Sequence, residues 1–476
     1  MKKVTQTVLG FKIEIVRDKK LEVTAYGGLV LALELMRAVI LKSWYRQLRD
    51  ALGYRDWKAV RRAVESVVLL VTAGGEHLDD VEILRHDKGF CRLAGFVPTS
   101  ATQMKDFLYR FHQDAAGRLL NDEDDARLSV RGHATLREEG PGLRGLADLN
   151  REVVRRMQGR EQRERATLDV DATIVEAHKR GALVAYEGTR GYQPQMAWWA
   201  EQRVWVGDQF RDGNVPAEMD CLGFVKAVVA SLPGSVSLVR LRGDSALYNE
   251  NLLTWLADIA GIEFAVSADM SEGLRAATLA VPEGEWKPYR GKRDEVQEER
   301  EVAEVVFVPA WGRTNKKKTN PLRYIAIRVR GRQRDILEGD GERWRHFAVV
   351  TNMSGDAADL LRWHREKQGT VEHGHGVMKN DLGGGVLPCG RFGANAAWWR
   401  LNVLTHNLLE MLKRVALPSS MHGLRPKGLR FRLLHLAGLV LRHARQVVLR
   451  LAESPYATVL VQARLALGEL ARGSPV

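Results

Sequence analysis

The chain has 476 residues, of which 45% are hydrophobic, so it can bury a large core and is not a low-complexity chain. Its 72 Lys and Arg outnumber 59 Asp and Glu, and the net charge of +13 is spread along the sequence, which favours a polyanionic partner. Three widely spaced cysteines argue against a disulfide framework or a structural zinc site, and no apolar run approaches the roughly 20 residues that span a bilayer.

The first 165 residues are predicted to be mainly helical. Apolar residues follow helical spacing over 26–40 and 57–73. A further helix is expected after Pro98, where Ser100 and Gln103 match a capping box. The charge-rich stretch 113–165 is expected to form a solvated, partly helical bridge.

From residue 166 the pattern changes to short apolar runs that alternate with helical segments. The expected order is three strands, a helix, a strand, a helix and a strand, which is the order of an RNase H-like core. The strands are expected over 166–175, 181–188, 203–210, 236–244 and 262–269, and the helices over 220–232 and 249–261. Tryptophans 198, 199, 398 and 399 are expected in the core.

The remaining sequence interrupts and then completes this core. Three strand-like runs follow at 303–311, 324–331 and 346–352, and a helix is expected over 355–380. The fold class is therefore predicted to be an α/β RNase H-like core of the retroviral integrase type, with a β-rich insertion and helical flanks. The expected parts are 1–165 (helical), 166–269 (first part of the core), 270–352 (β-rich insertion), 353–394 (helix completing the core) and 395–476 (helical).

Three acidic residues fall where such a core would carry chemistry. Asp171 lies on the first strand, two residues after Asp169 and on the same face. Asp244 follows the fourth strand, and Glu372 lies on the late helix with Lys379 two turns further along. Carboxylates so placed can hold two divalent ions that activate a water or a 3′-hydroxyl against a phosphodiester, and oxygen ligands suit Mg²⁺ or Mn²⁺.

Each acid also has an ordinary structural interpretation. The two strand acids could pair with Arg165 or Lys179 on an edge strand. Asp244 could cap the helix that follows it. Glu372 could lie on a solvated helix face in a weak ion pair.

Residues 168–173 (LDVDAT), 241–248 (LRGDSALY) and 363–385 (WHREKQGTVEHGHGVMKNDLGGG) carry a family resemblance. With them the chain resembles the DDE transposases of bacterial insertion sequences, in the group with a Tyr-Arg-Glu-Lys signature and a β insertion. The resemblance covers almost the whole length. It implies that Asp171, Asp244 and Glu372 bind two metal ions and that Lys379 acts with them in catalysis. The family's Asp-x-Thr pattern favours Asp171 over Asp169 as the first acid.

The signature is altered in its first half. Counting back from Glu372 places Arg365 at the tyrosine position and Gln368 at the arginine position. Both are expected near DNA, together with Lys105 and Arg110 of the N-terminal region. Related transposases stack a flipped base on an aromatic residue of the insertion, and Trp286, Trp311 and Trp344 are the alternatives for that role here, with Trp311 taken as the DNA contact. The basic run 313–320 is either a DNA-facing or a solvated loop.

The resemblance implies a DNA transposase that cuts and joins double-stranded DNA at terminal inverted repeats. It further implies a homodimer on DNA, no nucleotide cofactor, no membrane association and a bacterial cytoplasmic location at the nucleoid. Two alternatives stay open: an RNase H-like nuclease that does not join DNA, and a transposase-derived DNA-binding protein that has lost catalysis.

Overall fold

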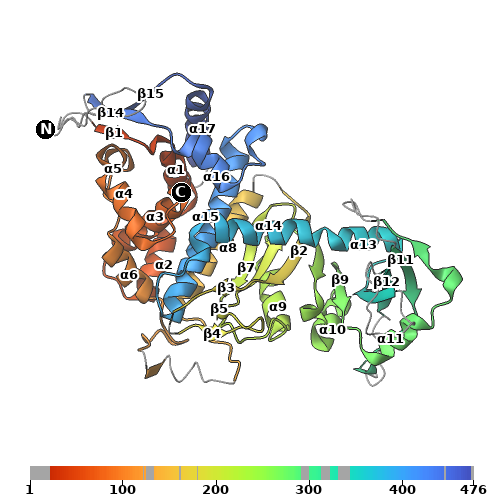
Figure 1. Cartoon of the computed structure of the whole chain (residues 1–476). Helices are drawn as coiled ribbons and strands as arrows, with labels where there is room; N and C mark the ends of the chain where they lie inside the picture. Colours follow the sequence, from red (N-terminus) through yellow and green to blue (C-terminus); the bar gives the residue numbers. More distant parts are fainter. Residues whose placement is uncertain are drawn as a thin grey trace, which may run out of the picture.

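The chain folds into a central β-sheet with helical regions around it (Figure 1). The computed structural model describes residues 22–121, 123–124, 133–159, 162–179, 181–290, 300–311, 322–330, 344–443 and 446–472. The basic run 313–320 lies outside these residues. No helix among the described residues is long and apolar enough to cross a membrane.

The N-terminal region is helical, as predicted. It contains α1 (Val30–Val39), α2 (Lys42–Leu52), α3 (Trp57–Ala73), α4 (Val81–His86), α5 (Lys88–Ala94) and α6 (Ala101–Tyr109). Helix α3 has the predicted bounds, because the Asp56 side chain caps its first turn and Gly74 follows its last residue with a φ of 102°. The predicted capping box of Ser100 and Gln103 begins α6.

The prediction of a solvated bridge over 113–165 is wrong for α8 (Pro141–Gln158). One face of this helix is buried, with Leu143, Leu146, Leu149 and Val153 all inside. The density of charge in the sequence hid an amphipathic pattern, since most charged residues lie on the opposite face and Glu152 alone of them is buried.

A long buried helix, α15 (Phe392–Ala416), joins the N-terminal region to the sheet. It contacts α1, α3, α6 and α8 as well as the strand β7 (Val204–Gln209). Arg400, on this helix, is itself buried and ion-paired with Glu139 and Asp208. Both halves of the molecule therefore share one hydrophobic core around α15.

The central sheet has nine strands in the order β10-β11-β12-β13-β9-β8-β2-β6-β7. The strands besides β7 are β2 (Arg165–Ala172), β6 (Gln195–Trp199), β8 (Leu238–Gly243), β9 (Ile262–Ala268), β10 (Lys287–Pro288), β11 (Arg300–Val305), β12 (Arg323–Arg330) and β13 (Trp344–Thr351). The pairs β2–β8 and β8–β9 are parallel, and the others are antiparallel. This mixed sheet with helical flanks agrees with the coarse fold prediction.

The second strand of the core is not the one predicted. Residues 181–188 contribute β4 (Leu183–Val184) to a small separate sheet with β3 (Val175–Glu176) and β5 (Arg190–Tyr192). The strand between β2 and β7 is instead β6, whose five residues are all buried. A strand buried on both faces lacks the polar alternation that marks a half-exposed strand, so its pattern was not recognised.

The three strands predicted in the insertion exist as β11, β12 and β13. They do not form a separate sheet, because β13 hydrogen-bonds to β9 in antiparallel register, from Ala348↔Ala268 to Thr351↔Ala265. The insertion therefore extends the central sheet (Figure 1).

Helices lie along the sheet and carry the last predicted acid. Helices α9 (Cys221–Ser231), α10 (Glu250–Asp258) and α11 (Glu272–Leu279) connect the strands, and α13 (Ala357–Arg365) and α14 (Lys367–Asn380) follow β13. Helix α14 packs on β2 and β6, while α13 packs on β9 and β11. The two helices thus run one after the other across the sheet (Figure 1).

The prediction that residues 395–476 are helical is only partly correct. After α15 it contains α16 (Pro426–Leu429), the strands β14 (Gly438–His443) and β15 (Gln446–Leu451), and α17 (Pro455–Arg472). Strand β14 also pairs with β1 (Glu22–Thr24), so the first described residues share a small sheet with two strands of the C-terminal region.

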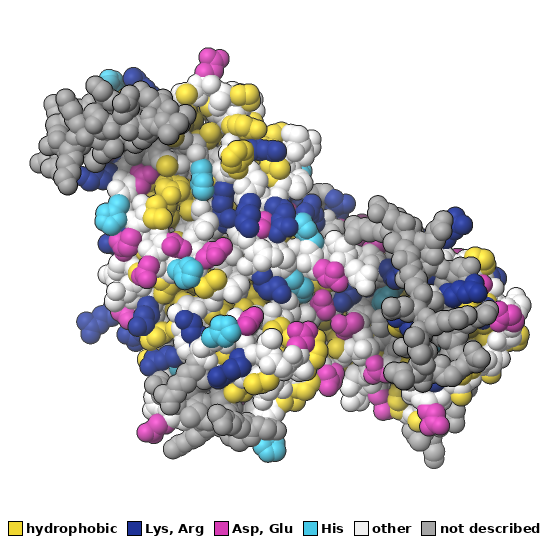
Figure 2. All heavy atoms as spheres, in the orientation of Figure 1, with side chains coloured by type: hydrophobic (Ala, Val, Ile, Leu, Met, Phe, Trp, Pro, Cys, Tyr) yellow, Lys and Arg dark blue, Asp and Glu magenta, His cyan; other side chains and the backbone are white. Residues whose placement is uncertain are grey.

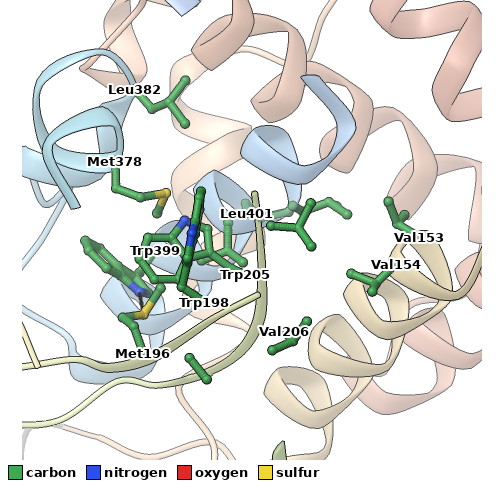
Figure 3. Packing of buried hydrophobic residues seen from close by; sticks show 14 of the residues in the cluster. Val153, Val154, Met196, Trp198, Trp205, Val206, Met378, Leu382, Trp399 and Leu401 are labelled. Atoms are coloured by element: carbon green, nitrogen blue, oxygen red, sulfur yellow. Dashed lines mark hydrogen bonds between the residues drawn. The ribbon is translucent and has the colours of Figure 1, made fainter. Parts of the chain in front are cut away.

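The predicted tryptophan core is confirmed. All four residues, Trp198, Trp199, Trp398 and Trp399, are at most 3% exposed. Figure 3 shows Trp198 and Trp205 packed close to Trp399 and Met196. The indole of Trp399 donates to the Met196 sulfur at 3.3 Å, and the rings of Trp198 and Trp205 meet edge to face at 4.7 Å.

Candidate active site

Asp171 and Asp244 lie at the ends of two adjacent parallel strands. Strand β2 ends at Ala172 and β8 at Gly243, and the two strands run side by side in the same direction. The Asp171 side chain is 17% exposed and that of Asp244 is 50% exposed. The sheet therefore brings these two predicted acids to one edge.

Asp244 also caps the short 3₁₀ turn η3 (Ser245–Leu247), as the structural alternative expected. Its Oδ1 accepts a hydrogen bond from the Ala246 amide at 3.1 Å. The capping fixes the orientation of the carboxylate, and its other oxygen, Oδ2, faces the Lys367 ammonium. The structural and the functional interpretations of Asp244 are thus compatible.

A lysine ammonium lies between the two carboxylates. The Nζ of Lys367, the first residue of α14, is 3.3 Å from Asp171 Oδ1 and 3.9 Å from Asp244 Oδ2. Its side chain is only 12% exposed. Lys367 was not among the predicted site residues.

The pKa of Asp171 is raised to about 6. Burial of the carboxyl is the largest cause. The positive charge of Lys367 opposes this rise, and the negative charge of Asp244 adds to it. Two carboxylates held this close together create a position that favours a cation.

Asp169 belongs to a different environment on the same strand. It is fully buried, and Arg242 of β8 donates to both its oxygens at 2.6 and 2.9 Å. The Thr370 hydroxyl of α14 also donates to it. The expectation of an edge strand whose acids pair with Arg165 or Lys179 is wrong, because β2 is central and Asp169 pairs across it with Arg242.

Arg242 connects this buried pair to the helices above the sheet. Its Nη1 donates to the Trp363 carbonyl at 2.7 Å and lies 3.5 Å from Glu366 Oε2. The neighbouring ring of His364 contacts the Gly243 carbonyl at 3.0 Å. The junction of α13 and α14 is therefore fixed to the ends of β2 and β8, beside the acid pair.

Glu372 lies on α14 with its side chain exposed. Among the described residues, no three His, Cys, Asp or Glu side chains are close enough to hold one metal ion. The structure thus brings Asp171 and Asp244 together and leaves Glu372 outside that cluster, on the helix that packs against β2.

Lys379 is turned toward the segment that follows β2. Its Nζ donates to Thr173 Oγ1 at 3.0 Å and to the Ile174 carbonyl at 3.4 Å. Burial lowers the pKa of this ammonium, and the negative charges of Glu187 and Asp171 oppose that shift. Lys379 is therefore a half-buried cation in the field of the acid pair.

His375 lies on the same side of α14. Its Nε2 is 3.7 Å from Asp171 Oδ2, and burial lowers its pKa to about 3, so the ring is neutral at ordinary pH. The ring packs against Trp205 at 5.1 Å. Gly374 permits this approach, because a Cβ there would lie 2.7 Å from the Trp205 ring.

A hairpin tip adds an exposed aromatic side chain near the acids. Tyr186, between β4 and β5, is 79% exposed and donates to Glu187 at 3.0 Å. Its pKa is raised, mainly by this hydrogen bond, and further by the negative charges of Glu187, Asp171 and Asp244.

The residues predicted to contact DNA are spread over several elements. Arg365 ends α13, and Gln368 is exposed in the first turn of α14. Lys105 and Arg110 are exposed at α6, where they lie over the rings of Tyr109 and Tyr54. Trp311 is partly buried against the main core.

One cavity adjoins the N-terminal part of this set. It has a volume of about 530 Å³, and Lys105, His77, His178 and Lys179 contribute to its lining. It lies between α6 and the segment after β3.

On the face drawn in Figure 2, Lys and Arg side chains (dark blue) are distributed over the N-terminal helices, the core and the insertion.

Sequence reasoning missed Lys367 and the clamp of Arg242. Lys367 is five residues before Glu372, a spacing that does not mark a shared helix face. Arg242 lies in a strand whose other residues are mostly apolar, and an arginine among apolar strand residues was a usable signal of a buried ion pair. The partner strand of Arg242 could not be known without the β2–β8 register.

Comparison with known proteins places the chain in a family. The model of the transposase DDE domain, group 1, matches residues 16–472. The cryo-EM structure of a piggyBac transposase synaptic complex with hairpin DNA is similar to the chain, with 11% identity and a TM-score of 0.45 over 94% of this chain and 82% of that one. No curated protein matches it in sequence. With a family match that spans nearly its whole length, the chain belongs to the DDE-domain transposases of group 1 and is a DNA-transposing enzyme.

Proposed function

We propose that this transposase moves an insertion sequence by a cut-and-paste route, in which it cleaves the element's ends and joins the freed 3′-hydroxyls to target DNA. The observation that carries this proposal is the convergence of Asp171 and Asp244 around one positive charge. The strand order β7-β6-β2-β8-β9, with the first three strands antiparallel and the last three parallel, supports an RNase H-like core.

Transposases of this family use divalent metal ions, and the acid pair fits such an ion. The position between the carboxylates already holds a cationic group, and both donors are hard oxygens of the kind that Mg²⁺ and Mn²⁺ prefer. Asp171, Asp244 and Glu372 would hold two ions per site. The bound ions would polarise the phosphodiester and make a water or hydroxyl a better nucleophile.

The residues of α14 have separate tasks in this proposal. Glu372 is exposed and must turn toward the acid pair to complete the ligand set. Lys379, held near the end of β2 by Thr173, would contact a phosphate next to the scissile bond. Asp169 is left out of the proposed ligand set, because Arg242 donates to both its oxygens.

Double-stranded DNA is the proposed partner, and the terminal inverted repeats would be recognised by the region 1–165. A homodimer would pair the two ends, and transesterification requires no nucleotide cofactor, because the phosphodiester energy is conserved. Arg365, Gln368 and Trp311 are further proposed DNA contacts. We place the protein with the nucleoid in a bacterial cytoplasm.

The test uses the full chain and linear DNA that carries the inverted repeats flanking its gene. We expect cleavage at the repeat ends with Mg²⁺ or Mn²⁺, and joining of precut ends to a plasmid. Cleavage without joining of precut ends would identify a nuclease. Specific end binding with no cleavage in either metal would identify a DNA-binding protein that has lost catalysis.

A further inference from the structure

Lys367 occupies the centre of the acid pair, although the pair is proposed to hold metal ions. Its ammonium is 3.3 Å from Asp171 and 3.9 Å from Asp244, and its side chain is nearly buried. A surface lysine would gain little from such contacts and would extend into water. This lysine instead neutralises two carboxylates that would otherwise repel each other.

The backbone at Lys367 is held in place from both sides. On one side, Trp363 accepts from Arg242 and His364 contacts the Gly243 carbonyl at 3.0 Å. On the other side, the Thr370 hydroxyl donates to Asp169. These contacts fix the first turn of α14 over the ends of β2 and β8, so the fold itself directs Lys367 to the acids.

A divalent ion and this ammonium cannot occupy the same position. Two cationic groups within 4 Å repel each other strongly in a partly buried site. The lysine side chain has four rotatable methylene groups, so its ammonium can move several ångströms while the helix stays fixed. Once displaced, it remains close to the place where the proposed substrate's phosphate would lie.

The altered signature lacks a positive charge that the displaced Lys367 ammonium can supply. The family's arginine position holds Gln368, which is neutral and exposed. We infer that Lys367 is a phosphate-positioning residue that neutralises Asp171 and Asp244 in the metal-free protein and moves onto the DNA backbone when metal binds. This inference rests on the proposed function and supplies the cation that the signature position lacks.

The experiment compares the full-length protein with its Lys367→Met and Lys367→Arg variants. Methionine keeps much of the side-chain length without charge, and Lys226→Met, an exposed lysine of α9, is the matched control. Mn²⁺ binding is measured by calorimetry without DNA at about pH 8. We expect Lys367→Met to bind Mn²⁺ about fivefold more tightly than the parent, because no ammonium has to leave. The control should bind like the parent.

Cleavage at saturating Mn²⁺ is the second measurement. A charge-assisted contact to phosphate supports a loss of about 10- to 150-fold for Lys367→Met. Lys367→Arg should recover part of the rate, since arginine also binds phosphate. Tighter metal binding together with slower cleavage distinguishes this role from that of a metal ligand, whose loss would weaken both.

The inference is overturned if Lys367→Met binds Mn²⁺ no more tightly than the parent, or if it cleaves at the parental rate. It is also overturned if the parent does not bind Mn²⁺ at all. If the parent binds Mn²⁺ but does not cleave repeat-end DNA, the proposed function is contradicted. The phosphate role of Lys367 then fails as well. The competition between Lys367 and the metal ion is still tested by the binding measurement.

Discussion

Two aspartates of β2 face the same helix from different surroundings. Asp169 lies in a buried, bidentate ion pair with Arg242, whereas Asp171 is 17% exposed near the end of β2, beside Lys367. A buried charge that loses its partner is strongly destabilising, whereas removal of Asp171 takes away a carboxylate whose charge is disfavoured by burial. Side chains two residues apart can thus serve packing and chemistry separately.

The first prediction separates these two aspartates by stability. Asp169→Ala leaves the Arg242 guanidinium buried without its partner and should lower the free energy of unfolding by about 3–5 kcal/mol. Asp171→Ala should not lower it, because burial disfavours the charged form of this carboxylate and its removal ends that cost. Urea denaturation followed by tryptophan fluorescence measures both. Equal losses for the two variants would contradict the assignment of Asp169 to structure.

The second prediction concerns catalysis by the proposed acids. Alanine at Asp171, Asp244 or Glu372 should abolish cleavage in Mg²⁺ and leave binding to repeat ends intact, because phosphate contacts dominate affinity for DNA. Gel-shift and cleavage assays on the same preparation test this. A variant that keeps near-parental cleavage would remove its residue from the proposed metal ligands, and Glu372 is the most informative of the three because it lies outside the acid pair.

The third prediction assigns Lys379 a smaller effect. Its ammonium is free to exchange Thr173 for a DNA phosphate, a contact of roughly 1.5–3 kcal/mol. Lys379→Ala should therefore slow single-turnover cleavage by about 10- to 150-fold without eliminating it, and Lys379→Arg should recover part of the rate. If the alanine variant cleaved and joined like the parent, the lysine would serve only to hold the end of β2.

At the level of elements, the predictions that succeeded rest on strong local patterns. The bounds of α3 follow from Asp56 and Gly74, and the start of α6 follows from Ser100 and Gln103. The strand that ends before Asp244 was recognisable from its apolar run and its glycine. Much of the acid pair could therefore be located from the sequence.

The elements that were missed depend on distant partners. Strand β6 is buried on both faces, so nothing in its own residues distinguishes it from a buried helix segment. Helix α8 is buried because α15, more than 230 residues later, covers it. The position of Lys367 between two carboxylates depends on the register of β2 with β8, which no local pattern encodes.

The fourth prediction tests end recognition by α6 in the full chain, because α15 completes the core of the N-terminal region and a fragment would lack it. If Lys105 and Arg110 contact phosphates, the double alanine variant should lower the slope of log affinity against log salt by about 2. Binding is measured by fluorescence anisotropy on repeat-end DNA, with Lys226→Ala as the control. An unchanged slope would move end recognition to another element.

At the scale of the whole molecule, α15 carries a titratable group in the shared core. His406 is 3% exposed, packs against Trp198 and Trp205, and contacts the Arg203 carbonyl at 3.1 Å. Burial is the main cause that lowers its pKa to about 4 from 6.5. At this position the unfolded chain therefore binds a proton more readily than the folded one. The contribution of His406 to folding stability is greatest above pH 6.5.

The fifth prediction concerns the pH dependence of stability that follows from the lowered pKa of His406. The contribution of His406 is present above pH 6.5 and is lost as the pH falls toward 4, so at pH 5 the protein should be less stable than at pH 7 by about 2 kcal/mol from this group. His406→Gln keeps a donor for the Arg203 carbonyl and should reduce the pH dependence by that amount. Urea midpoints at both pH values measure it, and an unchanged pH dependence in the variant would contradict the assignment.

The hydrogen bonds between β13 and β9 tie the insertion to the central sheet, in which β9 pairs with β8, the strand that precedes Asp244. A domain on a flexible linker could swing toward DNA and set its own distance from the scissile phosphate. A strand ladder resists such rotation, because every step of it would break backbone hydrogen bonds. The distance from the insertion to the acid pair is thus set by the sheet itself and not by a hinge.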